Sequence, residues 1–129
     1  MKNIIIDLDG TLTIESDDSY SNKTPNTQVI RKLREYKEMG FNITISTSRG
    51  MRTHNGNIGQ INIHTLPNIL EWLNKHNVPY DEVIVGKPWC GFDGFYIDDK
   101  AIRPSEFCSM RYENILELLK QEKQKNIGE

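Results

Sequence analysis

The sequence has little of three things that would assign its class at once: cysteine, an excess of one charge, and long apolar runs. Its 129 residues include only Cys90 and Cys108, so we expect reduced thiols rather than a disulfide framework. Lys and Arg number 16 against 18 Asp and Glu, a net charge of −2, which argues against a binder of nucleic-acid backbones. The apolar runs are only a handful of residues long, far below the ~20 residues of a membrane helix.

A targeting segment is not expected either, because only Ile4-Ile5-Ile6 is apolar before the acidic Asp7. We therefore predict a cytoplasmic protein that binds neither membrane nor nucleic acid. The length suits a single domain over residues 1–129, since domains most often contain about 100–150 residues. With 36% hydrophobic and 26% charged residues, the chain has the composition of a folded protein rather than a disordered one.

Apolar patterns and turn residues predict an alternation of strands and helices. Short β-branched or aromatic runs predict strands at residues 4–8, 41–46, 82–85 and 94–97. A first helix is predicted from Thr24-Pro25 to Gly40, and a second from 65–67 to just before Val78-Pro79. Apolar residues at helical spacing predict the buried faces of these helices and of a last helix: Val29, Ile30, Leu33 and Tyr36; Ile69, Leu70, Trp72 and Leu73; Tyr112, Ile115, Leu116 and Leu119.

Three segments do not fit a regular period. Residues 14–25 are polar and predict an irregular excursion, while residues 50–63, with three glycines among asparagines, predict a long loop. Beyond Lys120 the chain is rich in Lys, Glu and Gln and predicts a frayed, solvated end. The overall pattern indicates an α/β fold with a parallel sheet flanked by helices.

Polar residues follow each predicted strand, and in a parallel sheet these strand ends would meet at one edge, where ligands bind. The four segments are Asp7-Leu8-Asp9-Gly10-Thr11, Ser46-Thr47-Ser48-Arg49, Gly86-Lys87 and Asp98-Asp99-Lys100.

The chemistry of these residues predicts a site for magnesium and phosphate. Carboxylates gathered from Asp7, Asp9, Asp98 and Asp99 would repel one another without a cation among them. Mg²⁺ is the oxygen-preferring cation that keeps waters and pairs with phosphates. Lys87 and the Thr47 hydroxyl add positive charge and a hydrogen-bond donor, while one Asp could attack phosphorus and another could transfer a proton.

The same residues resemble the motifs of the haloacid dehalogenase superfamily. Ile4-Ile5-Ile6 followed by Asp7-Leu8-Asp9-Gly10-Thr11-Leu12-Thr13 is similar to the first motif, an apolar strand and DxDGT. Ile43-Thr44-Ile45-Ser46-Thr47 resembles the second motif, Lys87 the third, and Phe95-Tyr96-Ile97-Asp98-Asp99 the fourth, all in the order of the family. The length, the Met51-Arg52-Thr53 loop and Gly86-Lys87-Pro88-Trp89-Cys90-Gly91 also resemble small phosphatases of capsular polysaccharide gene clusters.

The resemblance implies a three-layer, Rossmann-like fold and a role for each matched residue. Asp7 would be the nucleophile, Asp9 the general acid and base, and Lys87 a phosphate ligand that also orients Asp7. Mg²⁺ would be held by Asp7, by the backbone carbonyl of Asp9, and by the second pair of aspartates. The residues implied in phosphate or substrate binding are Gly10, Thr11, Thr47, Ser48, Arg49 and Lys87, and those implied in metal binding are Asp7, Asp9, Asp98 and Asp99.

Two features depart from the family pattern. Only eleven positions lead from Lys87 to Asp98, and within them the chain must return to the start of the sheet and cross it. An extended chain of this length reaches roughly 30 Å, which is enough. Secondly, the sequence has no segment long enough for a cap domain, which leaves 14–25 and 50–63 as the candidates to cover the site. A homo-oligomer in which loop 50–63 of a neighbour closes the site is therefore an expectation as well.

The sequence predicts a hydrolase of a small phosphorylated metabolite, such as a sugar or polyol phosphate. Two alternatives stay open: a phosphatase of phosphoproteins or nucleic-acid ends, and a module that binds a phosphorylated metabolite without turnover. Arg49 and Arg103 are candidates to grip the substrate, but surface arginines are common. His54 and His64 lack a third partner at metal-ligand spacing, so they are structural or face the substrate. Cys90 has no evident base, which argues against a catalytic thiol.

Overall fold

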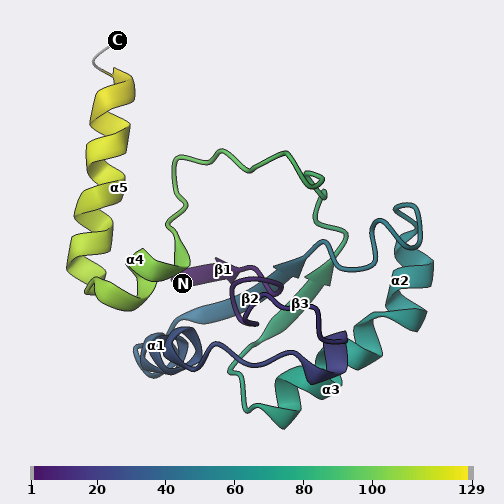
Figure 1. Cartoon of the computed structure of the whole chain (residues 1–129). Coiled ribbons are helices and arrows are strands. Elements are labelled where there is room, and N and C mark those ends of the chain that lie inside the picture. The colour runs from purple at the N-terminus through teal and green to yellow at the C-terminus, as the bar shows by residue number, and fades with distance from the viewer. Residues whose placement is uncertain (1, 128–129) are drawn as a thin grey trace. The chain divides into compact units, whose positions relative to one another are not determined.

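Figure 1 shows the computed structural model of the chain, which describes residues 2–127 and has the α/β architecture expected from the sequence. The chain divides into two compact units, Met1–Trp89 and Cys90–Glu129, and each is described here by itself. The first unit contains the sheet. None of the helices within the described residues is long and apolar enough to cross a membrane.

The sheet of the first unit has three parallel strands in the order β1-β2-β3. They are β1 (Asn3–Ile6), β2 (Asn42–Thr47) and β3 (Glu82–Val85). Three predicted strands are thereby confirmed, with shifts of one or two residues at the ends of β1 and β2. Ile5 is aligned with Thr44, and Thr44 with Glu82, so the carboxyl ends of all three strands point to the same edge.

The core of the first unit lies on one face of this sheet. Ile6, Ile43 and Ile45 alternate along the strands and are buried, whereas Ile5 on the opposite face is 73% exposed. Helix α1 (Thr27–Glu38) buries the four side chains that its period predicted. Helix α3 (Leu66–Lys75) buries Ile69, Trp72 and Leu73, while Leu70 is half-buried.

Helix α1 begins later than the sequence predicted. Its N-cap is Asn26, whose side chain accepts a hydrogen bond from Val29 N, rather than Thr24. Thr24 and Pro25 are engaged elsewhere: Thr24 O accepts from Ile14 N at 2.8 Å, and Pro25 bridges to Thr13. These contacts close the excursion at its base, and within it lies the short 3₁₀ helix η1 (Tyr20–Asn22).

The prediction of a continuous loop over residues 50–63 was wrong in its second half. Residues 50–57 form turns, but Ile58–His64 is the helix α2. The Asn57 side chain caps it by accepting from Gln60 N at 3.1 Å, and Ile61 is fully buried. Gly59 and Asn62 concealed this helix, because seven residues are too few to show a clear period against the low helix propensity of these two.

The second unit consists of a long irregular segment, helix α4 (Pro104–Ser109), which the sequence did not predict, and helix α5 (Tyr112–Ile127). In α5, Ile115 is buried while Leu116 is 48% exposed. The end beyond Lys120, predicted to be frayed and solvated, is helical as far as Ile127, and residues 121–125 are exposed. Residues 128–129 lie outside the described residues.

The predicted strand at residues 94–97 was also wrong: within the described chain these residues join no sheet. Phe95 and Ile97 are 77% and 88% exposed. Aromatic and β-branched residues favour a strand only where a pleated, half-buried surface receives them, so propensity alone misled.

Candidate active site

The site is built where the three parallel strands end. Asp7 follows β1, Thr47 is the last residue of β2, and Lys87 lies two residues beyond β3. Lys87 N donates to Thr47 O at 3.2 Å, which ties the last two segments together beyond the sheet. Thus the structure brings together the residues of three of the four predicted segments.

A tight turn after β1 presents the first pair of carboxylates. Leu8 O accepts hydrogen bonds from the backbone N–H groups of Thr11, Leu12 and Thr13, at 2.9 to 3.3 Å. Gly10 has φ +81°, a left-handed conformation in which a side chain would be strained, and its N–H donates to Thr13 Oγ1 at 3.1 Å. The glycine of the DxDGT sequence is therefore required by the turn that carries Asp7 and Asp9.

The carboxylate of Asp7 has a hydrogen-bond donor on each oxygen. Thr11 Oγ1 donates to Oδ2 at 3.1 Å, and Lys87 Nζ lies 3.3 Å from Oδ1. The Asp7 side chain is nevertheless 33% exposed. An oriented carboxylate that solvent still reaches beside an ammonium group is suited to meet an incoming anion.

Asp9 is paired with Arg49, a partner that the sequence did not predict. Arg49 Nε lies 3.0 Å from Asp9 Oδ2 and Nη2 lies 2.7 Å from Oδ1, a two-pronged ion pair. The Arg49 side chain is only 3% exposed, whereas that of Asp9 is 31% exposed. The guanidinium is thus buried, while the carboxylate that it holds still reaches solvent.

Thr47 and Ser48 occupy the end of β2. Thr47 is buried, and its hydroxyl oxygen accepts from Arg49 N at 3.1 Å, which leaves the O–H proton free to be donated to another group. Ser48 is half-buried, and its carbonyl accepts from Met51 N at 3.0 Å at the start of the turn that follows. The hydrogen bonds of these two residues therefore fix the main chain on both sides of Arg49.

The segment after β2 approaches the segment after β3. Gly86 has φ +90°, and a Cβ atom there would lie 2.6 Å from Ile58 Cδ1 at the start of α2. The Arg52 guanidinium lies over the Trp89 ring at 5.9 Å from its centre. Residues 50–58 consequently flank the segment that carries Lys87. His54 and His64 stack at 5.6 Å between ring centres.

Asp98 and Asp99 belong to the second unit. The Asp98 side chain accepts from Lys100 N at 2.8 Å, and both aspartates are exposed. Arg103 caps α4, where its N–H donates to Glu106 Oε1 at 2.8 Å, and Cys90 is half-buried. The metal site predicted from all four aspartates remains a prediction, and no three His, Cys, Asp or Glu side chains within residues 2–127 gather as a ready ligand set.

The oxygens present in the first unit fit a cation that takes few ligands from protein. Mg²⁺ is commonly bound by one or two carboxylates, with waters and substrate oxygens completing an octahedron. The partly exposed carboxylate of Asp7 meets that requirement, because it combines solvent access with a fixed orientation.

Comparison with known proteins decides the family. The family model of the haloacid dehalogenase-like hydrolases matches residues 4–128. This chain belongs to the haloacid dehalogenase-like hydrolases. The chain is also similar to the crystal structure of a target protein from Vibrio cholerae, at 62% identity and a TM-score of 0.93, over 95% of this chain and 99% of that one. A search of curated proteins finds no match.

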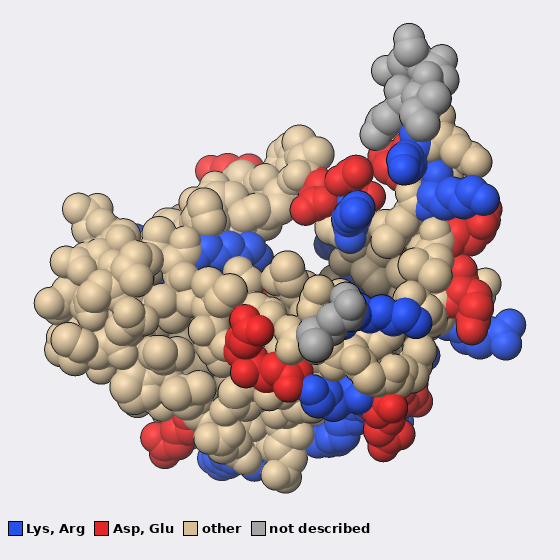
Figure 2. All heavy atoms as spheres, turned by 180° about the vertical axis from the view of Figure 1, so that it is seen from behind, with Lys and Arg blue, Asp and Glu red and all other residues tan. Residues whose placement is uncertain are grey.

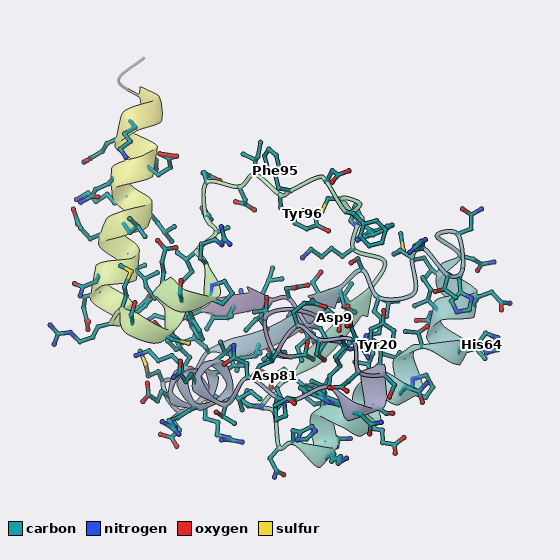
Figure 3. The ribbon with its side chains drawn as sticks, in the orientation of Figure 1. Asp9, Tyr20, His64, Asp81, Phe95 and Tyr96 are labelled. Atoms are coloured by element: carbon teal, nitrogen blue, oxygen red, sulfur yellow. The ribbon has the colours of Figure 1, made fainter. Side chains whose placement is uncertain are left out.

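One residue of this hydrolase's site escaped the sequence analysis. The Arg49 guanidinium carbon lies 4.1 Å from the centre of the Tyr20 ring, which comes from the excursion at 14–25 (Figure 3). Tyr20 is the one aromatic residue in that polar segment, and this isolation was the available signal.

Proposed function

We propose that this haloacid dehalogenase-like hydrolase is a Mg²⁺-dependent phosphomonoesterase that acts through a phosphoaspartate at Asp7. The observation that carries the proposal is the Asp7 carboxylate, held between the Thr11 hydroxyl and the Lys87 ammonium while still open to solvent. Asp9 lies two residues along the same turn, which supplies a second carboxylate for proton transfer.

The first half-reaction transfers the phosphoryl group to the enzyme. An oxygen of Asp7 attacks phosphorus, the bond from phosphorus to the leaving oxygen breaks, and protonated Asp9 gives its proton to that oxygen. Lys87 holds phosphoryl oxygens and stabilises their charge, and the Thr47 O–H donates to another of them. The products of this step are a free alcohol and an acyl phosphate on Asp7.

The second half-reaction regenerates the enzyme. Water attacks phosphorus, the carboxylate of Asp9 takes a proton from that water, and the bond from phosphorus to Asp7 breaks. Inorganic phosphate leaves, Asp7 is again a carboxylate, and Asp9 is again protonated. Water and ester are thereby converted into alcohol and phosphate with no further reactant.

In the first unit, the residues that would hold the metal are the Asp7 carboxylate and the Asp9 backbone carbonyl. Asp98 and Asp99, which the sequence predicts as further metal ligands, belong to the second unit. When bound, Mg²⁺ would neutralise charge on the phosphoryl oxygens and polarise phosphorus for attack. The protein's own residues carry out every proton transfer in the scheme.

A small, uncharged leaving group, such as a sugar or polyol, agrees best with the surroundings of the site. Residues 53–70 contain no Asp, Glu, Lys or Arg, and this end of the first unit, at the left in Figure 2, shows mostly uncharged surface. Asparagine side chains in this segment can both donate to and accept from hydroxyl groups. The low charge also disfavours nucleic-acid ends, which require phosphate-binding basic side chains.

The test is a screen of small phosphate esters, with a phosphopeptide and a 5′-phosphorylated oligonucleotide in the same panel. We expect EDTA-sensitive release of phosphate, with the fastest turnover on sugar or polyol phosphates. Faster turnover of the phosphopeptide or oligonucleotide would assign the enzyme to macromolecular substrates. Binding without turnover of every ester, including a generic aryl phosphate, would contradict an enzymatic function.

A further inference from the structure

The buried guanidinium of Arg49 is committed to another protein side chain. Its Nε and Nη2 contact the two oxygens of Asp9 at 3.0 and 2.7 Å, and only 3% of the side chain is exposed. A planar guanidinium that grips both oxygens fixes the plane of a carboxylate as well as its position, which a single point charge does not do. Each Asp9 oxygen retains a lone pair that the pairing does not use, so proton transfer remains available.

Arg49 is itself held from two directions. Its backbone N–H donates to the buried Thr47 hydroxyl at 3.1 Å, which fixes the main chain at the end of β2. The ring of Tyr20 lies against the guanidinium, 4.1 Å from its carbon to the ring centre. A cation stacked on an aromatic face is attracted to it, and the attraction is stronger where the cation is desolvated, as the nearly buried Arg49 is.

The excursion that carries Tyr20 is fastened to the rest of the first unit. Its base is closed by the bridge between Thr13 and Pro25. Near its end, Lys23 O accepts from the Trp72 indole N–H at 2.9 Å, so the chain just after η1 is tied to α3. The Tyr20 ring is therefore placed by a structured segment.

We infer that Arg49 is a positioning residue for Asp9, and that Tyr20 holds Arg49 in place. The inference rests on the proposed function, in which Asp9 gives a proton to the leaving group and takes a proton from the attacking water. Arg49 then acts through Asp9 and makes no contact with the phosphoryl group. The excursion at 14–25 thus contributes to proton transfer through the contact of Tyr20 with Arg49.

This role predicts a dependence on the leaving group. An alkyl phosphate releases a strongly basic oxygen and needs a well-placed proton donor, whereas p-nitrophenyl phosphate releases a stable anion with little need of one. The phosphoryl end is the same in both esters. Loss of Asp9 positioning should therefore lower kcat/KM for the alkyl ester selectively, while loss of a phosphate ligand should lower both values alike.

The experiment measures kcat/KM for p-nitrophenyl phosphate and for the best alkyl phosphate of the screen in full-length wild type and Arg49→Lys. Lysine keeps the charge but cannot grip both oxygens. We expect the alkyl ester to lose at least about tenfold more than the aryl ester, or roughly 1.4 kcal/mol. Arg34→Lys is the matched control, because Arg34 bonds Asn77 O on the surface and should leave the ratio unchanged.

Tyr20 gives a second, independent test if Arg49→Lys fails to fold. Tyr20→Leu should reduce the alkyl-to-aryl ratio of kcat/KM, and Tyr20→Phe, which keeps the ring, should restore it. Equal loss on both esters in Arg49→Lys, or equal ratios in the two Tyr20 variants, would overturn the inference. Wild type that hydrolyses neither ester would instead refute the proposed function, so the two failures are distinguishable.

Discussion

The orientation of the Asp7 carboxylate is set by a contact on each of its two oxygens. The Thr11 hydroxyl and the Lys87 ammonium approach different oxygens of its carboxylate, and both donors come from segments that polar patterning alone had singled out. This part of the site was predictable because residues that follow adjacent parallel strands must meet at one edge of the sheet.

The pairing of Asp9 with Arg49 was not predictable in the same way. Forty positions separate the two residues, and their contact depends on the side-chain conformation of a buried arginine rather than on strand order. The sequence suggested Arg49 only as a candidate to grip substrate, a role that a guanidinium bonded to Asp9 through two nitrogens is poorly placed to take. Tyr20 was missed for the same reason.

The first prediction is that Asp7→Asn abolishes turnover without unfolding the protein. An amide is a poor nucleophile, but it has nearly the shape of the carboxylate and can still accept from Thr11. We expect less than about one per cent of wild-type kcat/KM, equivalent to about 2.7 kcal/mol or more in barrier. Glu71→Gln, which removes an exposed charge on α3, is the control and should retain activity. Higher residual activity with an unchanged circular dichroism spectrum would show that Asp7 is not the nucleophile.

At the scale of whole elements, predictions were correct where a helix had a clear hydrophobic period or a strand had a neighbouring strand to pair with. Helix α1 showed four apolar residues at helical spacing and all four are buried, whereas α2 was missed because it is short and contains Gly59. The run at 94–97 has strand-like composition, but within residues 2–127 it pairs with no strand. Composition predicts what a segment can form, and pairing decides what it does form.

Asp81 joins three elements at the end of the sheet opposite the site, where Figure 3 labels it away from Asp9. Its carboxylate accepts from Lys37 Nζ of α1 at 2.6 and 2.7 Å and from Ile43 N of β2 at 2.8 Å. The Lys37 bond and then the Ile43 bond hold the pKa of Asp81 below its ordinary value of 3.8. A lowered pKa means that the folded state favours the carboxylate form.

The second prediction follows from that pKa. The stabilisation is complete above pH 3.8, the ordinary value, and is lost as the pH falls through the lower value of the folded state. Asp81→Asn should therefore have a lower Tm than wild type at pH 7, and the two curves should converge in acid below about pH 4. Thermal unfolding followed by circular dichroism at several pH values measures this. A Tm difference that persists undiminished to pH 2 would mean that the charge of the Asp81 carboxylate is not the source of the stabilisation.

The third prediction concerns the turn at residues 53–56, which lies between Arg52 and α2. We propose that this turn contacts the leaving group and so selects the substrate. Residues on either side of it contact the segment around Lys87, at Gly86 and Trp89. Replacing these four residues by Gly-Ser-Gly-Gly keeps glycine at position 56, where φ is +76°, and leaves Asn57 to cap α2. Binding energy from a remote part of the substrate lowers the barrier only for substrates that have that part.

The expected result is a loss at least about tenfold larger in kcat/KM for the best substrate of the screen than for p-nitrophenyl phosphate, or roughly 1.4 kcal/mol. Glu71→Gln on α3, which changes an exposed residue outside the proposed site, provides a control for nonspecific disturbance. Equal loss on both esters would assign the turn to support of the catalytic residues, and no loss on either would exclude it from the site.

At the scale of the whole molecule, the candidate catalytic and metal-binding residues are distributed over both units of the chain. The first unit supplies the sheet, Asp7, Asp9 and Lys87, while Asp98 and Asp99 are carried by the second, and the family match spans both. Sequence order could predict this distribution, since the motifs resemble those of the family along most of the chain. It could not predict the conformation of residues 90–103, which contain no regular element to give a period.

The last prediction is that the full-length enzyme requires Mg²⁺ and is inhibited by Ca²⁺. Mg²⁺ accepts a few carboxylate ligands and completes a tight octahedron with water and phosphate oxygens. Ca²⁺ prefers more ligands at longer distances, so it would occupy the same oxygens but displace Asp7 from the line of attack on phosphorus. The oxygens of Asp7 are also fixed by Thr11 and Lys87, which limits how far the carboxylate can adjust.

The measurement is kcat/KM against Mg²⁺ after treatment with EDTA, repeated with increasing Ca²⁺ at a fixed Mg²⁺ concentration. Thermal stability against each cation reports binding independently of turnover, because a ligand that binds the folded state raises the Tm. We expect both cations to raise the Tm but only Mg²⁺ to support hydrolysis, with Ca²⁺ competing. Asp7→Asn should weaken the Mg²⁺-dependent rise in Tm, which would connect the metal to the nucleophile. Full activity in EDTA, or equal rates with the two cations, is incompatible with a magnesium site at Asp7.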